Sequence, residues 1–127
     1  MRRAAAVVVA SLLALSACAA PRNTLGTADS PCFRALPTAK AAVHHQGRLV
    51  GVRKVSRRRL ATLFPVEPPS GNEFCLVAFS GSFRPDQVER PALRDPGRYA
   101  AVVVTLRGTQ ALQTFLVDQL PMHLRHR

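Results

Sequence analysis

An unbroken apolar run at residues 74–79 (Phe-Cys-Leu-Val-Ala-Phe) constrains the fold more than any other stretch of the chain. Ser70-Gly71 precedes this run and Ser80-Gly81 follows it, and both pairs are turn signals. A short apolar run between two turns is typical of a strand buried on both faces. We therefore place residues 74–79 in the centre of a sheet.

Three more stretches predict partner strands for this segment. Residues 99–106 are rich in valine, and residues 112–120 form another apolar run after the turn-like sequence Arg-Gly-Thr-Gln at 107–110. This arrangement predicts a hairpin, although the second run also fits a helix that begins at Gln110; we favour the strand. Residues 49–55 predict a further strand, in which Gly51 either marks a bulge or weakens the assignment.

Two short helices are expected before and between these strands. The first covers residues 37–46, with Pro37 in its first turn and Gly47 as a stop signal. The second covers residues 57–64 and is capped by Ser56. The sequence thus predicts an α+β fold: a small, mainly antiparallel sheet of three or four strands with both helices on one face.

The first eighteen residues have the layout of a secretory signal. A basic head, Arg2-Arg3, precedes an apolar run at residues 4–14, which is too short to cross a membrane as a helix of about 20 residues. The sequence Leu15-Ser16-Ala17-Cys18 then resembles the lipobox of bacterial lipoproteins. This resemblance implies that cleavage follows Ala17 and that Cys18 carries the membrane-anchoring lipid. The alternative is an ordinary secretory signal that ends in a cysteine by chance.

The resemblance also implies where the protein is located and where the signal peptide ends, whereas the rest of the division follows from composition. We expect an exported protein, anchored through the lipid to the outer face of the cytoplasmic membrane, or to the outer membrane of a host that has one. Residues 1–17 form the signal peptide, and residues 18–30 form the lipidated N-terminus and a flexible tether. Residues 31–121 form a single α+β domain, and residues 122–127 form a basic tail.

Two cysteines remain once Cys18 is assigned to the lipid. Because an exported chain meets an oxidising environment, Cys32 and Cys75 are expected to form a disulfide. The alternatives are two buried free thiols or a catalytic pair. The chain has no Cys-x-x-Cys motif, so a thioredoxin-like redox function is not supported.

Positive charge is the strongest chemical signal in the mature chain. The formal net charge of +11 falls to +9 when Arg2 and Arg3 leave with the signal peptide. The densest group of cations, which we consider candidates for anion binding, comprises Arg53, Lys54, Arg57, Arg58 and Arg59.

For an exported protein, the expected partners of such a cluster are anionic lipid, a phosphate-bearing wall polymer or an envelope protein. Nucleic acid is disfavoured by the extracytoplasmic location and by the low aromatic content of six Phe, one Tyr and no Trp. The alternative is a solvated basic face that only keeps the protein soluble.

Catalytic signals are weak. Ser80 follows an apolar strand as a hydrolase nucleophile does, but Ala78 and Ser82 replace the glycines of the Gly-x-Ser-x-Gly motif. The histidines predict no metal site and no cofactor is expected; they are His44, His45, His123 and His126. The sequence therefore predicts a non-enzymatic envelope binding or accessory module. The alternative is a small exported hydrolase or thiol enzyme that uses Ser80 or the cysteines.

Overall fold

The computed structural model describes residues 31–121, so the predicted signal, tether and basic tail lie outside the described residues. The helical elements in this range are η5 (Pro31–Ala35), α2 (Leu36–Ala42), α3 (Arg57–Leu63) and η6 (Pro85–Gln87). The strands are β1 (Arg48–Ser56), β2 (Glu73–Phe83), β3 (Gly97–Thr105) and β4 (Ala111–Val117). None of the helices in residues 31–121 is long and apolar enough to cross a membrane.

The four strands form one antiparallel sheet in the order β1-β2-β3-β4. The predicted α+β class with a small antiparallel sheet is confirmed, and residues 111–117 form a strand rather than a helix. Gly108 makes the β3–β4 turn, with a φ of +80° and an amide that donates to the Thr105 carbonyl at 2.8 Å. The bulge at Gly51 is also confirmed, because the register shifts between Leu49 and Gly51.

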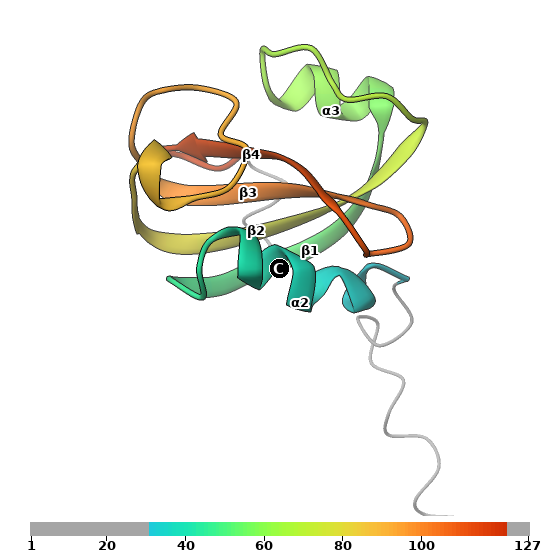
Figure 1. Ribbon diagram of the computed structural model, residues 1–127. Helices are drawn as coiled ribbons and strands as arrows, with labels where there is room; N and C mark the ends of the chain where they lie inside the picture. Colours follow the sequence, from blue (N-terminus) through green and yellow to red (C-terminus); the bar gives the residue numbers. More distant parts are fainter. Residues whose placement is uncertain (1–30, 122–127) are drawn as a thin grey trace, which may run out of the picture.

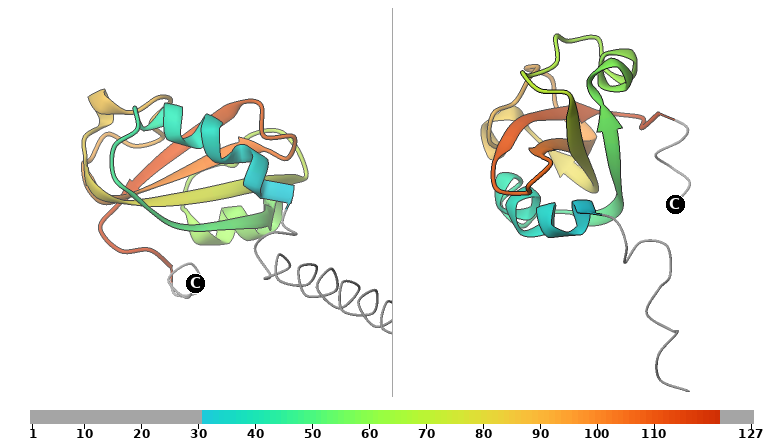
Figure 2. Two further views of the ribbon diagram at one scale, coloured as in Figure 1. Left: turned by 90° about the horizontal axis from the view of Figure 1, so that it is seen from below. Right: turned by 90° about the vertical axis from the view of Figure 1, so that its right-hand side faces the viewer.

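The two helices lie on opposite faces of the sheet, so the prediction that both cover one face was wrong (Figure 1). Along β2, side chains alternate between a core beneath α2, which contains Val77, and a core beneath α3, which contains Leu76. Strands β2 and β3 are apolar on both faces, and an apolar face must be covered to leave water. One helix on each side meets this requirement, as Figure 2 shows from two further directions.

The first predicted helix is shorter than expected and is preceded by another helical turn. Helix α2 ends at Ala42, because His44 and His45 adopt left-handed backbone conformations with φ values of 53° and 60°. Buried Ala39 and Ala42 pack towards the sheet. These small side chains allow the helix to approach the strands closely.

The second predicted helix is confirmed as α3. The Ser56 hydroxyl accepts a hydrogen bond from the Arg59 amide at 3.1 Å, which is the expected N-cap. Leu60 is the one buried residue of this helix. Just after the helix, the Phe64 ring stacks on Phe115 of β4 with ring centroids 4.2 Å apart. These two contacts hold α3 against the sheet.

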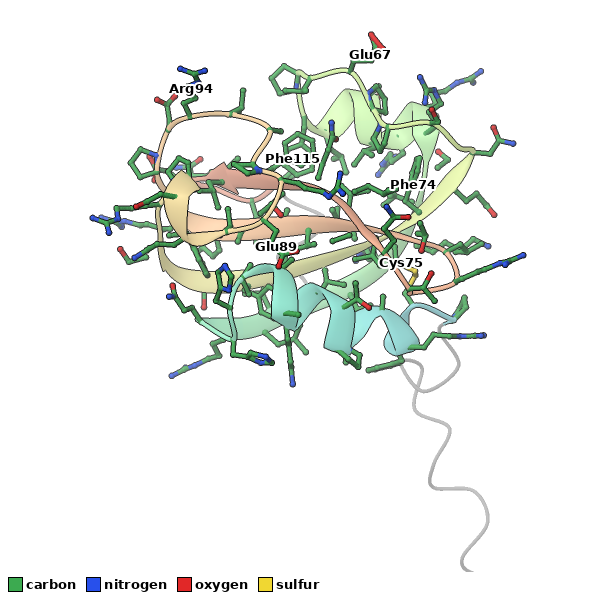
Figure 3. The ribbon with its side chains drawn as sticks, viewed as in Figure 1. Glu67, Phe74, Cys75, Glu89, Arg94 and Phe115 are labelled. Carbon is green, nitrogen blue, oxygen red and sulfur yellow. A yellow bond between two sulfur atoms is a disulfide. The ribbon has the colours of Figure 1, made fainter. Side chains whose placement is uncertain are left out.

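Cys32 of η5 and Cys75 of β2 form the predicted disulfide, with Cα atoms 5.3 Å apart (Figure 3). Both residues are fully buried in the core beneath α2. In the chain-entropy account, closing a loop of 43 residues stabilises the fold by about 4 kcal/mol. The bond fixes the first described residues of the chain against the β1–β2 side of the sheet.

Candidate functional site

Strand β1 carries the first part of the predicted cationic cluster and lies at one edge of the sheet. The chain reaches this edge through Gly47, whose φ is +83°. A Cβ atom at this position would lie 2.7 Å from the Ser80 carbonyl oxygen. Only glycine fits such a close approach, so Gly47 brings β1 into register with β2.

Adjacent cations on β1 point to opposite faces of the sheet. Arg53 is the register partner of Leu76 and lies on the α3 side, whereas Lys54 is the partner of Cys75 and lies on the α2 side. Both side chains are exposed. Lys54 Nζ lies 3.5 Å from Glu73 Oε2, and both side chains are about half exposed, so this ion pair contributes at most about 1 kcal/mol.

The three consecutive arginines at the start of α3 do not act as one group. Arg57 Nη1 donates a hydrogen bond to the Pro69 carbonyl, so this guanidinium holds the loop that follows α3. Arg58 and Arg59 are exposed and form no ion pair within residues 31–121. The first turn contains no acidic residue, although the helix dipole disfavours cations there.

Four of the five predicted anion-binding residues are exposed, and Arg57 is half-buried. We use the term basic edge for Arg53, Lys54, Arg58 and Arg59. Arg57 is left out because it is half-buried and donates to the Pro69 carbonyl, whereas Lys54 is exposed although it pairs with Glu73. The density of positive charge in the sequence predicted this cluster. The directions of Arg53 and Lys54 depend on the alternation of side chains along β1, and the position of Arg57 depends on the loop after α3.

The disulfide places the start of the domain next to the basic edge. Cys32 is bonded to Cys75, and Cys75 is the register partner of Lys54. The described chain begins one residue earlier, with Pro31 of η5, and η5 contacts both β1 and β2 (Figure 2). The first described element, η5, is thus bonded to the residue that pairs with Lys54.

The opposite edge of the sheet, formed by β4, is covered by the chain itself. The Thr114 amide donates to the Arg90 carbonyl at 2.9 Å, and the Ala92 amide donates to the Thr114 carbonyl at 2.9 Å. The Thr114 hydroxyl, which is fully buried, also donates to the Glu89 carbonyl at 2.8 Å. By contrast, no strand of the described residues pairs with the outer side of β1.

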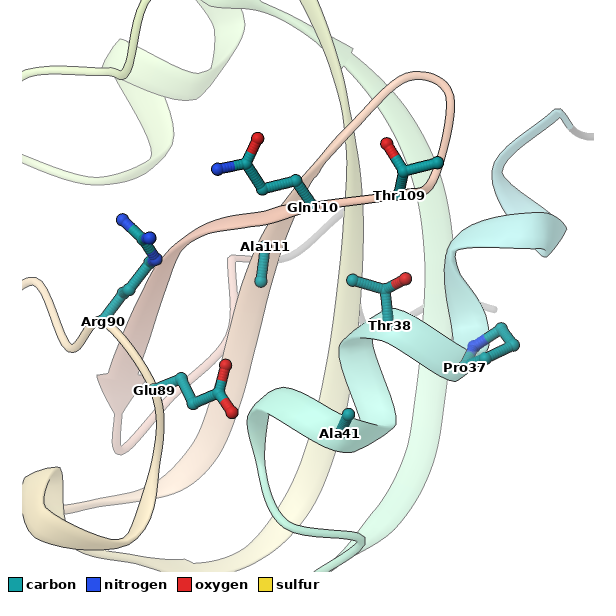
Figure 4. Close-up of a pocket in the computed structure, with 8 residues that line it drawn as sticks. All are labelled: Pro37, Thr38, Ala41, Glu89, Arg90, Thr109, Gln110 and Ala111. Atoms are coloured by element: carbon teal, nitrogen blue, oxygen red, sulfur yellow. The ribbon is translucent and has the colours of Figure 1, made fainter.

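A second candidate site is an open pocket of about 490 Å³ on the α2 face, shown in Figure 4. It lies between α2, the β3–β4 turn and the segment after η6. Its lining residues are Pro37, Thr38, Ala41, Glu89, Arg90, Thr109, Gln110 and Ala111. The pocket is wide enough for a small polar molecule.

The two charged residues that line this pocket, Glu89 and Arg90, are neighbours in the sequence. Glu89 and Arg90 form no ion pair with each other, and the left-handed conformation of Arg90, with a φ of 50°, separates their side chains. The Thr38 hydroxyl is already used, because it donates to the Gly108 carbonyl at 2.6 Å. Sequence reasoning missed this pocket, since its lining comes from three distant segments without a common motif.

The arrangement expected of a nucleophilic serine is not present at Ser80. This residue lies inside β2, which continues to Phe83, so the strand does not end in a turn at Ser80. Within residues 31–121, no histidine or carboxylate is hydrogen-bonded to the Ser80 hydroxyl. The structure also joins Cys32 and Cys75 in a disulfide, which leaves neither sulfur as a free thiolate.

The described histidines do not converge on a metal site. His44 and His45 are both exposed in the turn after α2. No group of three metal-ligating side chains is present among the residues that the structure describes. His123 and His126 lie outside this range.

Comparisons with known proteins leave these sites to be interpreted from their own geometry. No protein-family model matches the chain, and searches of the curated proteins and of the solved structures returned no significant match.

Proposed function

We propose that this chain is a lipid-anchored protein of the bacterial envelope and a non-enzymatic binding module whose basic edge recognises an anionic partner. One observation supports the proposal: Arg53, Arg58 and Arg59 on β1 and at the start of α3 are exposed and form no ion pair within residues 31–121. The lipobox-like sequence before Cys18 supplies the anchor in this proposal. A diacylated cysteine provides stable membrane attachment, because it buries two acyl chains.

The length of the connecting segment keeps the domain near its membrane. Residues 19–30 separate the proposed lipid on Cys18 from the described domain, and a fully extended chain of this length spans at most about 40 Å. The basic edge is therefore presented to components at the membrane surface, including lipid head groups and other anchored proteins. The mass of the mature protein tests the anchor directly, since the lipid adds a defined mass to Cys18.

The chemistry of the basic edge suits oxyanions. Arginine presents a planar fork of N–H donors that matches carboxylate and phosphate oxygens. At an anionic surface each basic residue contributes about 1 kcal/mol, and this contribution decreases as salt screens the charges. Anion recognition through the basic edge thus has a recognisable salt dependence.

We expect the combined variant Arg53→Ala, Arg58→Ala and Arg59→Ala to weaken binding to anionic probes about tenfold or more. The measurement uses the unlipidated mature chain carrying Cys18→Ser, with phosphatidylglycerol vesicles, phosphatidylcholine vesicles and polyglutamate across a salt series. Wild-type binding should be confined to the anionic probes and should decrease as salt rises.

A charge-matched control separates the basic edge from net charge. Arg94, Arg98 and Arg107 are exposed and belong to neither β1 nor α3. Their combined replacement by alanine removes the same three charges. Equal weakening in both triple variants would contradict recognition by the basic edge and would leave only a solvated positive surface.

A further inference from the structure

The outer side of β1 exposes backbone groups that its pairing with β2 does not use. The Arg57 amide donates to the Asn72 carbonyl at 2.8 Å, one step beyond the register pair Ser56–Glu73. In an antiparallel ladder, hydrogen-bonded pairs alternate with pairs whose N–H and C=O groups point outward. Arg53 and Val55 therefore bond to β2, whereas Val52 and Lys54 direct their backbone groups to the open side.

Side chains along the same strand suit a chain that pairs with it. Leu49 is 41% exposed, and Val52 is half-buried at the margin of the core beneath α2. Arg53 adds an unpaired positive charge on the α3 side, and Lys54, whose side chain is about half exposed and lies 3.5 Å from Glu73, adds a cation on the α2 side. The open edge thus combines backbone donors and acceptors that no strand among residues 31–121 pairs with, and it adds apolar and cationic side chains.

The opposed directions of Arg53 and Lys54 decide between two kinds of anionic partner. A membrane surface that meets one face of the sheet contacts one of these side chains, and at either face or edge it offers no main-chain groups that pair with the outward N–H and C=O groups of β1. A paired strand presents successive side chains to opposite faces. Two adjacent acidic residues in such a strand reach Arg53 and Lys54 together.

We propose that β1 binds an extended, acidic segment of a partner protein, which adds to the sheet as a fifth strand beside β1. This inference rests on the proposed function and names the partner of the basic edge. Main-chain hydrogen bonds to Val52 and Lys54 supply affinity, and a pair of adjacent carboxylates supplies specificity. The segment therefore contains two consecutive Asp or Glu residues among strand-forming residues.

A second copy of this chain fits the same edge poorly. Pairing of β1 with β1 of another copy places Arg53 and Lys54 of both chains close together, and like charges on adjacent strands destabilise a sheet. The net charge of +9 on the mature chain adds a long-range repulsion. Charge complementarity favours an acidic partner.

The test uses the unlipidated mature chain and the peptide acetyl-Thr-Val-Glu-Glu-Val-Thr-amide. We expect chemical-shift changes at the Val52 and Lys54 amides, and at least tenfold weaker binding of the matching peptide with two lysines in place of the glutamates. Two further peptides carry N-methyl groups at odd or at even positions. Because a paired strand uses the N–H groups of alternate residues, only one methylation pattern should abolish binding.

The results separate this inference from the proposed function. Equal binding of both N-methylated peptides would overturn strand addition while leaving anion recognition intact. Binding to phosphatidylglycerol vesicles without binding to any acidic peptide would assign the basic edge to lipid. Failure of all anionic probes would overturn the proposed function as well, and a concentration-dependent dimer that masks Val52 and Lys54 would assign the edge to a second copy.

A variant of the protein gives an independent check. Val52→Pro removes an outward N–H group without changing the charge, and proline is tolerated at such positions of edge strands. We expect at least tenfold weaker peptide binding together with retained binding to polyglutamate. If this variant does not fold, as judged by thermal unfolding, the N-methylated peptides still decide the question.

Discussion

The two edge strands of the sheet, β1 and β4, differ in what prevents another strand from pairing with them. Strand β4 is covered by residues 90–92, whose backbone bonds to Thr114 on both its N–H and its C=O groups. Strand β1 has no such cover among residues 31–121 and instead carries Arg53 and Lys54 at its centre. Native proteins use both covering segments and edge charges to prevent uncontrolled strand pairing.

This difference indicates that selective strand pairing is possible at β1 and not at β4. A covering segment closes an edge to every partner, whereas charges close it only to partners of the same sign. The covered edge requires Thr114, the one polar side chain buried among the described residues. At the charged edge, no strand among residues 31–121 pairs with the outward backbone groups, which is the condition that the proposed acidic partner requires.

Thr114→Val should break the covered edge and have the largest effect on stability. The substitution keeps the shape of the side chain but removes the hydroxyl that donates to the Glu89 carbonyl. Loss of this partly buried hydrogen bond should lower the free energy of unfolding by about 1–3 kcal/mol. Denaturant unfolding followed by circular dichroism measures this change.

The matched control for this variant is Thr105→Val. The Thr105 hydroxyl accepts hydrogen bonds from the Thr109 and Gln110 amides, but these bonds are exposed to water. Solvent can replace them, so the loss should be smaller than for Thr114→Val. A loss at Thr105 equal to or larger than that at Thr114 would contradict a special structural contribution from the covering segment.

At the charged edge, Arg59→Glu should raise the stability of the protein, by less than Thr114→Val lowers it. It removes a cation from the first turn of α3 and completes the sequence Ser-x-x-Glu, the capping box, with Ser56. The free energy of unfolding should rise by about 0.3–1 kcal/mol, and binding to polyglutamate should weaken. Thermal unfolding and a binding titration of the same sample measure both effects.

Arg94→Glu makes the same change of charge in an exposed loop away from α3. It should leave stability nearly unchanged and weaken polyglutamate binding less than Arg59→Glu does. If Arg59→Glu lowers stability, the unfavourable placement of cations at the start of α3 would be disproved.

Much of the fold follows from local patterns that the sequence displays. Apolar runs bounded by turns predicted the strands, Ser56 predicted the cap of α3, and the remaining cysteine pair predicted the disulfide. Each of these signals depends on a few neighbouring residues or, for the disulfide, on elimination. These features can therefore be predicted without knowledge of the tertiary arrangement.

Other features depend on contacts between distant segments and were missed. Strands β2 and β3 are apolar on both faces, so each face needs a cover, and one helix lies on each side. The prediction from the sequence placed both helices on one face and left the other face uncovered. The cover over β4 arises from a turn-rich segment with no strand pattern of its own. The hydrogen bond of Arg57 depends on the Pro69 carbonyl, which lies in the loop after α3.

Amide hydrogen exchange of the unlipidated mature chain tests the contrast between the two edges most directly. The account predicts fast exchange at the Val52 and Lys54 amides and slow exchange at Arg53, Val55 and Thr114. The Thr114 amide is slow although β4 is an outer strand, because it bonds to the Arg90 carbonyl. Equal protection of Val52, Lys54 and Thr114 would contradict the account, since it would show that the β1 edge is already covered.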